Sequence, residues 1–492
     1  MIVGSGIFST PSGILTTIGS PGMSLVLWVV GGIVSYFGVM AYLECCQDLE
    51  AKKVGTRNSF LTYTISSTNH FSSHFPHLEY LDYEFPHPKA LAPYLFCVSM
   101  IGLIRSGFCA ADSVVTGTYL MYAAGIHDPD LTQQWIARAI GVVVITFTCA
   151  VHAYSVRIGV AIENVLTVIK ILTLLLISIT GIVVLAGGVS IPKTTNFENA
   201  FAGTSNNGNA YASALFKIFF AYDGWNNCNY VLDELKNPIR TLKISSLMGI
   251  TIVSVLYILA NVAYFAVVPF DVILTSNTVV AGEFFVRVFG GTAGNVVLPV
   301  LVALSALGSV MCMSFTAGRV IFEAAREGYM PFGNFFGKVS KLGTPSNAFI
   351  VHWVLTLIWM LAPPPGDAYN FILDVTSYPE WWFYGLSVVG LIYLRFRDRD
   401  IPRPFRSSTI TNVLFILVAL FLGIVPFVPP TVKDTSLPYW LYPTVGLAFI
   451  AFSALLWYFQ VVLYGGLEKS VNIRRWQEGH RNMQDLTNEE QE

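Results

Sequence analysis

Charged residues are scarce in this sequence. Asp, Glu, Lys and Arg make up 12% of the 492 residues, and hydrophobic residues make up 54%. Soluble domains usually carry about 25% charged residues, so this scarcity excludes an ordinary soluble protein and predicts an all-α membrane protein embedded in a lipid bilayer. The net charge is only −2 and no basic block is interleaved with aromatics, so we expect no nucleic acid partner.

Other absences narrow the class further. The seven cysteines show no CxxC spacing, so the sequence supports neither a metal site nor a redox centre, and we expect no cofactor. Histidines in the apolar segments are too few for a buried catalytic cluster, which argues against a membrane enzyme such as an acyltransferase. A channel would need a pore motif or rings of like charge, and the sequence contains neither. We therefore expect no enzymatic activity.

Apolar segments recur along the whole chain, each close to the roughly 20 residues that span a bilayer. The twelve predicted spans, the first of them partial, cover residues 1–18, 24–44, 90–111, 139–154, 158–187, 211–229, 245–268, 295–316, 348–362, 371–394, 409–428 and 438–463. Most of the 28 Lys and Arg residues fall on one side if the N-terminus is cytosolic, which predicts cytosolic N- and C-termini. Residues 466–492 are charged and predict a cytosolic, partly disordered tail.

Two of these segments are interrupted by glycine. Gly4 and Gly6 flank Ser5 at the start of the chain, and Gly224 follows Asp223 in the segment that begins near residue 211. A helix broken at membrane depth must pass its freed backbone groups to a cavity, a neighbour or a ligand. Interrupted segments in both halves of a chain are the best sequence indication of a transporter's binding site. Tight helix packing remains the alternative for the two N-terminal glycines.

Two stretches depart from a complete bundle. Met1 directly precedes the first interruption, so the helical half expected before it is absent from this sequence. Residues 46–78 form a polar insertion in which we find no helical period. Two explanations stay open: a natural variant with a disordered loop, or a gene-model error that lost a first exon and retained an intron.

The residues around both interruptions resemble those of the L-type amino acid transporter (LAT) family of the amino acid–polyamine–organocation (APC) superfamily, and indicate a fungal member. The motifs are residues 4–11 and 220–226, supported by residues 233–238, 261–265 and 318–328. The resemblance extends over residues 1–44 and 79–465. It implies a secondary transporter that moves amino acids by alternating access, through exchange or proton-coupled uptake, in the plasma membrane. A transporter-like sensor, or an inactive truncated form that binds without flux, is the alternative.

The fold implied by this resemblance is a 5+5 inverted-repeat (LeuT-like) bundle. Residues 1–187 would form the first repeat, residues 211–394 the second, and residues 409–463 helices 11 and 12. Helices 1 and 6 would be discontinuous, with helix 1 truncated at its N-terminal half. Animal relatives are disulfide-linked to a heavy subunit through a loop Cys, but residues 125–135 contain none. We therefore expect no disulfide-linked heavy subunit, while a non-covalent partner remains open.

A helix N-terminus suits the carboxylate of an amino acid substrate, and helix C-terminal carbonyls suit its ammonium. The residues that the resemblance assigns to substrate binding are Ile2, Gly4, Ser5, Gly6, Phe220, Ala221, Asp223 and Asn226. Amides of Ser5 and Gly6 would bind the carboxylate, and carbonyls of Ile2, Phe220 and Asp223 the ammonium. By the same resemblance Phe220 and Tyr264 would act as gates, although an ordinary core aromatic is the alternative for Phe220.

Charged residues within the spans carry further hypotheses. Asp223 would bind a cationic substrate side chain or, alternatively, local backbone amides. Lys170 lies about 18 Å into its span, and the resemblance implies that its ammonium replaces a sodium ion and braces the first and fifth helices. A structural pair with Glu163 or a carbonyl is the alternative for Lys170. Arg105 and Asp112, seven residues apart on one helix face, have no assigned role.

Overall fold

The computed structural model describes residues 2–59, 81–226, 238–430 and 437–463, except positions 128, 190, 193, 277, 331, 365, 367, 400–402 and 404. Every regular element in these ranges is helical, which confirms the all-α class for the described residues. The first half contains α1 (Gly6–Ser9), α2 (Pro11–Ile18), α3 (Pro21–Ser59), α5 (Leu91–Ser99), η1 (Met100–Ile104), α6 (Arg105–Ala123), α7 (Leu131–Tyr154), α8 (Val156–Leu185) and α9 (Gly208–Tyr222).

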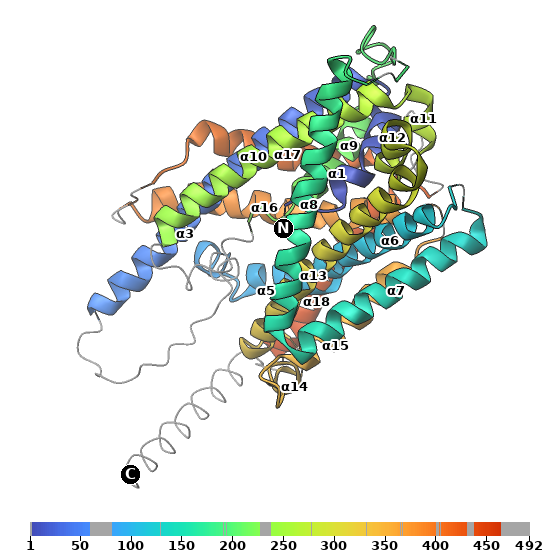
Figure 1. Ribbon diagram of the computed structural model, residues 1–492. Helices are drawn as coiled ribbons and strands as arrows, with labels where there is room; N and C mark the ends of the chain where they lie inside the picture. Colours follow the sequence, from blue (N-terminus) through green and yellow to red (C-terminus); the bar gives the residue numbers. More distant parts are fainter. Residues whose placement is uncertain are drawn as a thin grey trace.

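The second half continues the bundle, and helices far apart in sequence lie side by side, as α3 and α10 do in Figure 1. Its elements are α10 (Pro238–Val267), α11 (Phe270–Thr275), α12 (Val280–Phe289), η3 (Ala293–Val297), α13 (Leu298–Arg326), α14 (Gly333–Phe336), α15 (Ser346–Leu361), α16 (Ala368–Arg397), α17 (Thr409–Ile424), η4 (Val425–Phe427), α18 (Leu441–Trp457) and η5 (Tyr458–Leu463). Helix α6 of the first half packs against α13 and α16 of the second.

Within the described ranges, eight helical segments are long and apolar enough to cross a membrane. They are Pro21–Cys45, Leu91–Ala123, Leu131–Tyr154, Val156–Leu185, Thr241–Val267, Ala293–Arg326, Thr409–Phe427 and Leu441–Leu463. Each overlaps one predicted span. The other four predicted spans correspond to α1–α2, α9 and α15, which are shorter, and to α16, which carries several charged residues. Twelve spans and two inverted repeats therefore stay predictions.

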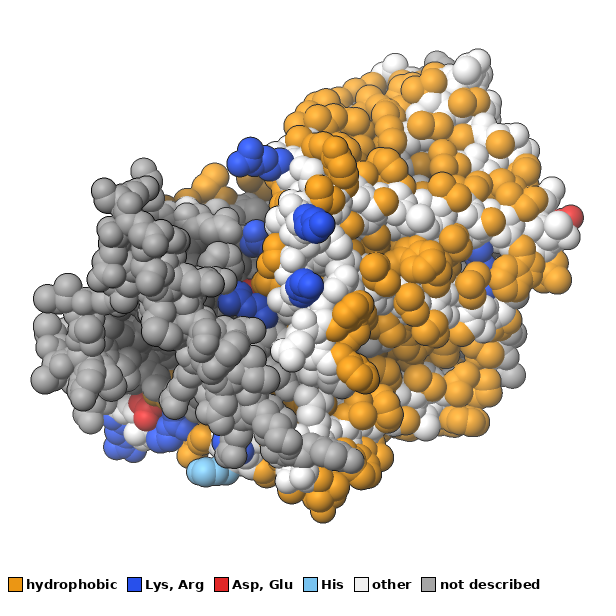
Figure 2. All heavy atoms as spheres, turned by 90° about the horizontal axis from the view of Figure 1, so that it is seen from below, with side chains coloured by type: hydrophobic (Ala, Val, Ile, Leu, Met, Phe, Trp, Pro, Cys, Tyr) orange, Lys and Arg blue, Asp and Glu red, His pale blue; other side chains and the backbone are white. Residues whose placement is uncertain are grey.

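The outer surface of the bundle is apolar along α8. Val165, Val168, Leu172 and Ile179 follow one another at near-helical spacing, and each is more than half exposed. Contiguous apolar patches of this kind mark surfaces that contact a partner or a membrane. Figure 2 shows hydrophobic side chains over much of one face, with Lys and Arg gathered mainly in a strip beside it. This surface suits a lipid environment better than water.

Helix α3 is longer than its predicted span, because it begins at Pro21 and ends at Ser59 instead of residue 44. Residues 46–59 of the polar insertion therefore belong to a helix, although the sequence there shows no helical period. This part contains good helix formers such as Gln, Glu, Ala and Lys, but it has no continuous apolar stripe by which a helix would be recognised. The rest of the insertion and the tail at 466–492 lie outside the described residues.

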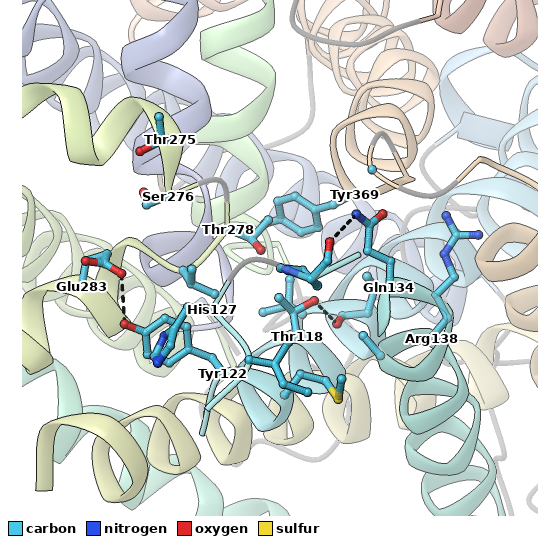
Figure 3. A pocket seen from close by; sticks show the side chains of 18 of the residues that line it. Thr118, Tyr122, His127, Gln134, Arg138, Thr275, Ser276, Thr278, Glu283 and Tyr369 are labelled. Atoms are coloured by element: carbon cyan, nitrogen blue, oxygen red, sulfur yellow. Dashed lines mark hydrogen bonds between the residues drawn. The ribbon is translucent and has the colours of Figure 1, made fainter. Parts of the chain in front are cut away.

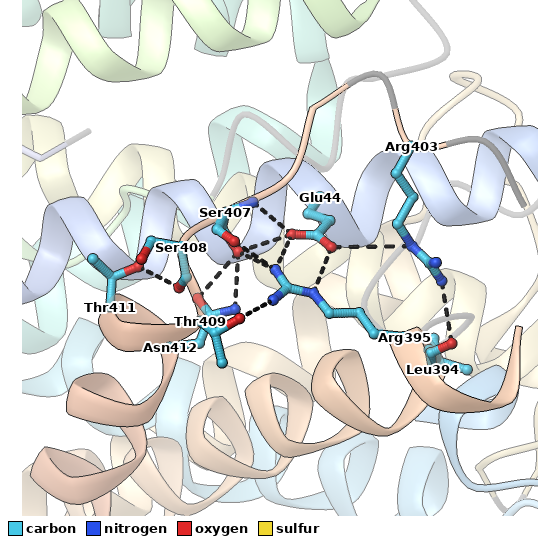
Figure 4. A network of polar contacts seen from close by, with 9 residues as sticks. All are labelled: Glu44, Leu394, Arg395, Arg403, Ser407, Ser408, Thr409, Thr411 and Asn412. Atoms are coloured by element: carbon cyan, nitrogen blue, oxygen red, sulfur yellow. Dashed lines mark hydrogen bonds and ion pairs between the residues drawn. The ribbon is translucent and has the colours of Figure 1, made fainter. Parts of the chain in front are cut away.

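A buried polar network joins α3 to α16 and α17 (Figure 4). The carboxylate of Glu44 accepts hydrogen bonds from Arg395 Nε at 2.8 Å and Nη2 at 2.5 Å. It also accepts hydrogen bonds from the N–H and the hydroxyl of Ser407 at 2.7 and 2.8 Å. A bidentate guanidinium with further donors compensates a buried carboxylate. The network therefore fixes α3 against the second half of the chain.

Candidate functional site

The chain is not helical at Gly4 and Ser5, where the sequence predicted an interruption. The first helical turn starts at Gly6, with buried Ser5 at the N-cap position. The Ser5 carbonyl accepts hydrogen bonds from the N–H groups of Phe8 and Ser9 at 3.0 and 3.1 Å. The Thr10 hydroxyl, between α1 and α2, donates to the Gly6 carbonyl at 2.8 Å. The first N–H groups of a helix have no partner within it, so this turn presents free donors.

The second predicted interruption lies at the end of α9, which stops at Tyr222. Asp223 has a ψ of 151°, and its N–H donates to the Phe220 carbonyl at 3.1 Å. Gly224 has a φ of +96°, which glycine adopts without strain. The helix therefore ends where the sequence predicted. The expected second helical piece, residues 228–235, lies outside the described residues.

The two interruptions meet at Gly6 and Ala221. A Cβ added to Gly6 would lie 2.5 Å from the Ala221 Cα, so only glycine allows α1 to approach α9 this closely. The Tyr257 hydroxyl of α10 lies 2.9 Å from the carbonyl oxygens of both Ile2 and Ala221, and its single proton can be donated to either. Gly6 therefore allows tight helix packing, which was the alternative explanation for this glycine. The same packing brings the two interruptions at Gly6 and at the end of α9 together.

Lys170 of α8 is buried beside the first interruption. Its Nζ donates to the Ser309 hydroxyl of α13 at 3.3 Å. A Cβ added to Gly4 would lie 3.1 Å from that same oxygen, so Lys170 reaches the start of the chain through Ser309. Lys170 therefore forms this hydrogen bond with Ser309, and not with Glu163, which the sequence offered as an alternative partner.

A hydrogen bond and an ion pair join α6 to the two interruptions. The Ser5 hydroxyl donates to Asp112 Oδ1. Arg105 Nη1 lies 3.4 Å from Asp223 Oδ2, and both side chains are almost completely buried. Arg105 therefore supplies a counter-charge to Asp223, which the sequence hypotheses had assigned either to a substrate cation or to local amides. Asp112 and Arg105, to which the sequence assigned no role, therefore both lie at the site.

A second carboxylate lies close to this ion pair. Glu380 of α16 is buried, lies within electrostatic range of Asp223 and Arg105, and accepts a hydrogen bond from the Tyr384 hydroxyl at 2.8 Å. Asn226 Nδ2 donates to the same hydroxyl at 3.0 Å. Asn226 is therefore held by α16, and among the described residues its Oδ1 has no hydrogen-bond partner.

Phe220 lies among aromatic rings. Its ring centroid is 5.2 Å from that of Phe108 and 6.4 Å from that of Tyr369. Tyr264, the second predicted gate, packs its ring against Phe284 of α12 at 5.7 Å. Its buried hydroxyl has no hydrogen-bond partner within the part of the chain that the structure describes. Phe220 and Tyr264, the two predicted gates, therefore pack against different aromatic rings.

A cavity of about 430 Å³ opens between α6, α7, α11, α12 and the start of α16 (Figure 3). One wall carries Tyr122, whose hydroxyl donates to Glu283 at 3.1 Å. On the opposite wall Arg138 donates to the carbonyls of residues 363 and 364, both at 2.7 Å. Tyr369 lines the cavity and also contacts Phe220. Tyr369 thus connects the wall of the cavity with Phe220 near the end of α9.

The comparison with known families decides the class. A family model described as amino acid permease matches residues 1–450. The chain belongs to the amino acid permease family. It is therefore an integral membrane protein and a transporter homologue rather than an enzyme, and the resemblance to L-type transporters of the APC superfamily is confirmed.

Relatives of this permease cover most of its length. It is 33% identical over 464 residues to the high-affinity methionine permease of Saccharomyces cerevisiae, covering 92% of this chain and 75% of that protein. It is 32% identical over 468 residues to the b(0,+)-type amino acid transporter 1 of Mus musculus, covering 94% and 85%. With the cystine/glutamate transporter of Homo sapiens it shares 31% identity over 423 residues, covering 86% and 76%. These relatives support amino acid transport across a membrane.

The side chains of the site that sequence reasoning missed include Tyr257, Glu380 and Tyr384. Glu380 had a usable signal, because a carboxylate inside an apolar span is a functional hypothesis by default. The two tyrosines had none among the 23 of the sequence. Among the described residues no group of three or more His, Cys, Asp or Glu could hold a metal ion.

Proposed function

We propose that this permease is a secondary transporter that moves amino acids by alternating access. The contact of Gly6 with Ala221 carries the proposal, because it places two interrupted helices of a membrane protein at one buried point. Substrate main-chain groups there would meet free helix-end donors and acceptors instead of apolar side chains.

The substrate carboxylate is assigned to the amides of Ser5 and Gly6, and the ammonium to the carbonyls of Ile2, Phe220 and Asp223. Both charges are expensive to bury unpaired, and oriented backbone dipoles compensate them. Ile2 is also within reach of Tyr257, so in this proposal the tyrosine positions the carbonyl that receives the ammonium.

We assign a neutral, largely apolar substrate side chain, such as that of methionine. Arg105 already compensates Asp223, so a neutral side chain leaves the ion pair intact. Phe108 and Phe220 supply apolar surface beside it. The methionine permease among the relatives supports the same class.

Phe220 is proposed as a gate, because its ring lies between the end of α9 and Tyr369 at the wall of the cavity. Tyr264 is proposed as a second gating residue. Lys170 is proposed to brace the start of the chain against α8 through Ser309, in place of a sodium ion.

The wider context of the transporter is proposed from the sequence. We place it in the plasma membrane, with cytosolic termini, an inverted-repeat bundle of about twelve spans and no disulfide-linked heavy subunit. For residues 46–78, sequencing the transcript across this stretch distinguishes the two explanations given above.

The test is counterflow in liposomes. The purified chain is reconstituted in vesicles loaded with unlabelled methionine, and entry of labelled methionine is followed. A transporter gives transient accumulation inside, whereas a sensor or an inactive form gives none. Protein-free vesicles are the control for leakage. Saturable methionine binding without counterflow would replace this proposal with the sensor.

A further inference from the structure

We propose that Glu380 is the proton-binding residue through which this permease couples uptake of a neutral amino acid to a proton gradient. This inference rests on the transport function proposed above. It names a residue that the sequence analysis did not single out and a coupling ion that the fold alone leaves open.

Charge balance at the site is the first argument. Two carboxyl groups, Asp223 and Glu380, interact with one guanidinium, that of Arg105, and all three side chains are buried. The next acid, Asp112, has Lys170 as a separate cation within electrostatic range. Among the side chains that the structure describes, one carboxyl group at Arg105 therefore exceeds the positive charge within reach. A buried charge without compensation is strongly unfavourable, so the excess group requires a proton or a cation.

Geometry selects Glu380 as the group that binds this proton. Asp223 lies 3.4 Å from the guanidinium of Arg105, which favours its charged form. The groups that face Glu380 are Asp223 and Arg105 from the two neighbouring helices, and Tyr384 from α16 itself, with the ring of Tyr42 of α3 packed on Tyr384. Glu380 accepts a hydrogen bond from the neutral hydroxyl of Tyr384, and a protonated carboxyl group can accept the same bond.

The position in the fold connects this proton with the substrate. Tyr384 joins Glu380 to Asn226, two residues after Gly224, so a change of charge at Glu380 is felt at the broken end of α9. Pro379 lies inside α16 directly before Glu380. Proline removes one helical hydrogen bond and kinks a helix, so α16 has a local bending point beside the proton site.

The resulting cycle is balanced in charge and protons. A proton from the outer solution binds the Glu380 carboxylate as the neutral substrate binds. The site then carries no excess charge while it is closed to both solutions. On opening to the cytosol, substrate and proton leave, and the carboxylate again carries its charge. One substrate molecule moves with one proton.

The experiment uses the full chain in liposomes that have an outer buffer about one pH unit more acidic than the lumen and a clamped membrane potential. With one proton per substrate this gradient sustains about a tenfold accumulation of labelled methionine, since one pH unit corresponds to a factor of ten. A pH dye in the lumen must report acidification when methionine is added outside. In E380Q we expect the accumulation ratio to fall to about one, with slower but measurable counterflow at equal pH.

Controls separate the possible failures. E198Q removes an exposed carboxylate and must accumulate methionine as the unchanged chain does. Absence of counterflow in the unchanged chain would refute the transport function itself. Counterflow without any response to the pH gradient would overturn only the coupling. Gradient-driven accumulation by E380Q would overturn the assignment, because Glu380 would then be dispensable for coupling. Complete loss of counterflow by E380Q would also overturn it, because Glu380 would then have a structural role. Proton-independent uptake of lysine in place of methionine would mean that a substrate cation compensates Glu380.

Discussion

Arg105 and Asp223 form a buried ion pair across 3.4 Å, between the first residue of α6 and the residue that ends α9. The pair ties α6 to the residue that ends α9. Low exposure on both sides removes the solvent screening that weakens surface pairs. Each member therefore depends on the other, and the broken end of α9 depends on both.

Removing Arg105 tests this dependence. In R105M the Asp223 carboxylate loses its counter-charge, and breaking a buried pair costs about 3–5 kcal/mol. We expect a clear fall in apparent melting temperature in detergent. The double variant R105M/D223N removes both charges and is expected to regain part of the loss. A double variant no more stable than R105M would contradict the pairing.

Lys170 is expected to be essential for transport. K170M removes the ammonium that donates to Ser309 beside Gly4, so we expect uptake to be abolished while the protein still reaches the membrane. Uptake and surface expression are measured in the same cells. K338M, at an exposed loop position, is the matched control. Normal uptake by K170M would refute the role.

Gly6 tests the contact between the two interruptions. G6A places a methyl group 2.5 Å from the Ala221 Cα, and overpacking of this kind costs about 1–3 kcal/mol. We expect reduced thermal stability and loss of methionine binding. G249A is the control in α10, because an added Cβ there meets no atom within 4 Å and gains up to about 1 kcal/mol of helix propensity. Equal stability of both variants would argue against a close contact at Gly6.

Tyr257 is expected to affect substrate affinity. Y257F keeps the ring but removes the proton shared between the Ile2 and Ala221 carbonyls. A hydrogen bond contributes about 0.5–1.5 kcal/mol, so we expect the KM for methionine uptake to rise about two- to tenfold. Y211F, at the half-buried start of α9, is the control. An unchanged KM would show that the hydroxyl does not position these carbonyls.

Sequence patterns among neighbouring residues predicted many of the helices. They did not predict contacts between residues that are distant in the sequence. Apolar length gave the long spans, and Gly224 beside Asp223 marked the end of α9, because both are properties of neighbouring residues. The pairing of Arg105 with Asp223 joins positions 118 residues apart, which no period or motif indicates. The extension of α3 to Ser59 was hidden for another reason, since a helix without an apolar stripe has no hydrophobic period.

The Glu44 network has a consequence for the order of assembly during synthesis. Its main partner, Arg395, lies 351 residues later in the chain, and Ser407 follows still later. Glu44 therefore enters the membrane region long before any of these donors has been translated. Its carboxylate must stay hydrated until α16 and the start of α17 are made, and α3 can lock into its final place only then. A chain released before Arg395 would keep that end of α3 unsecured, however many of the earlier spans had already been inserted.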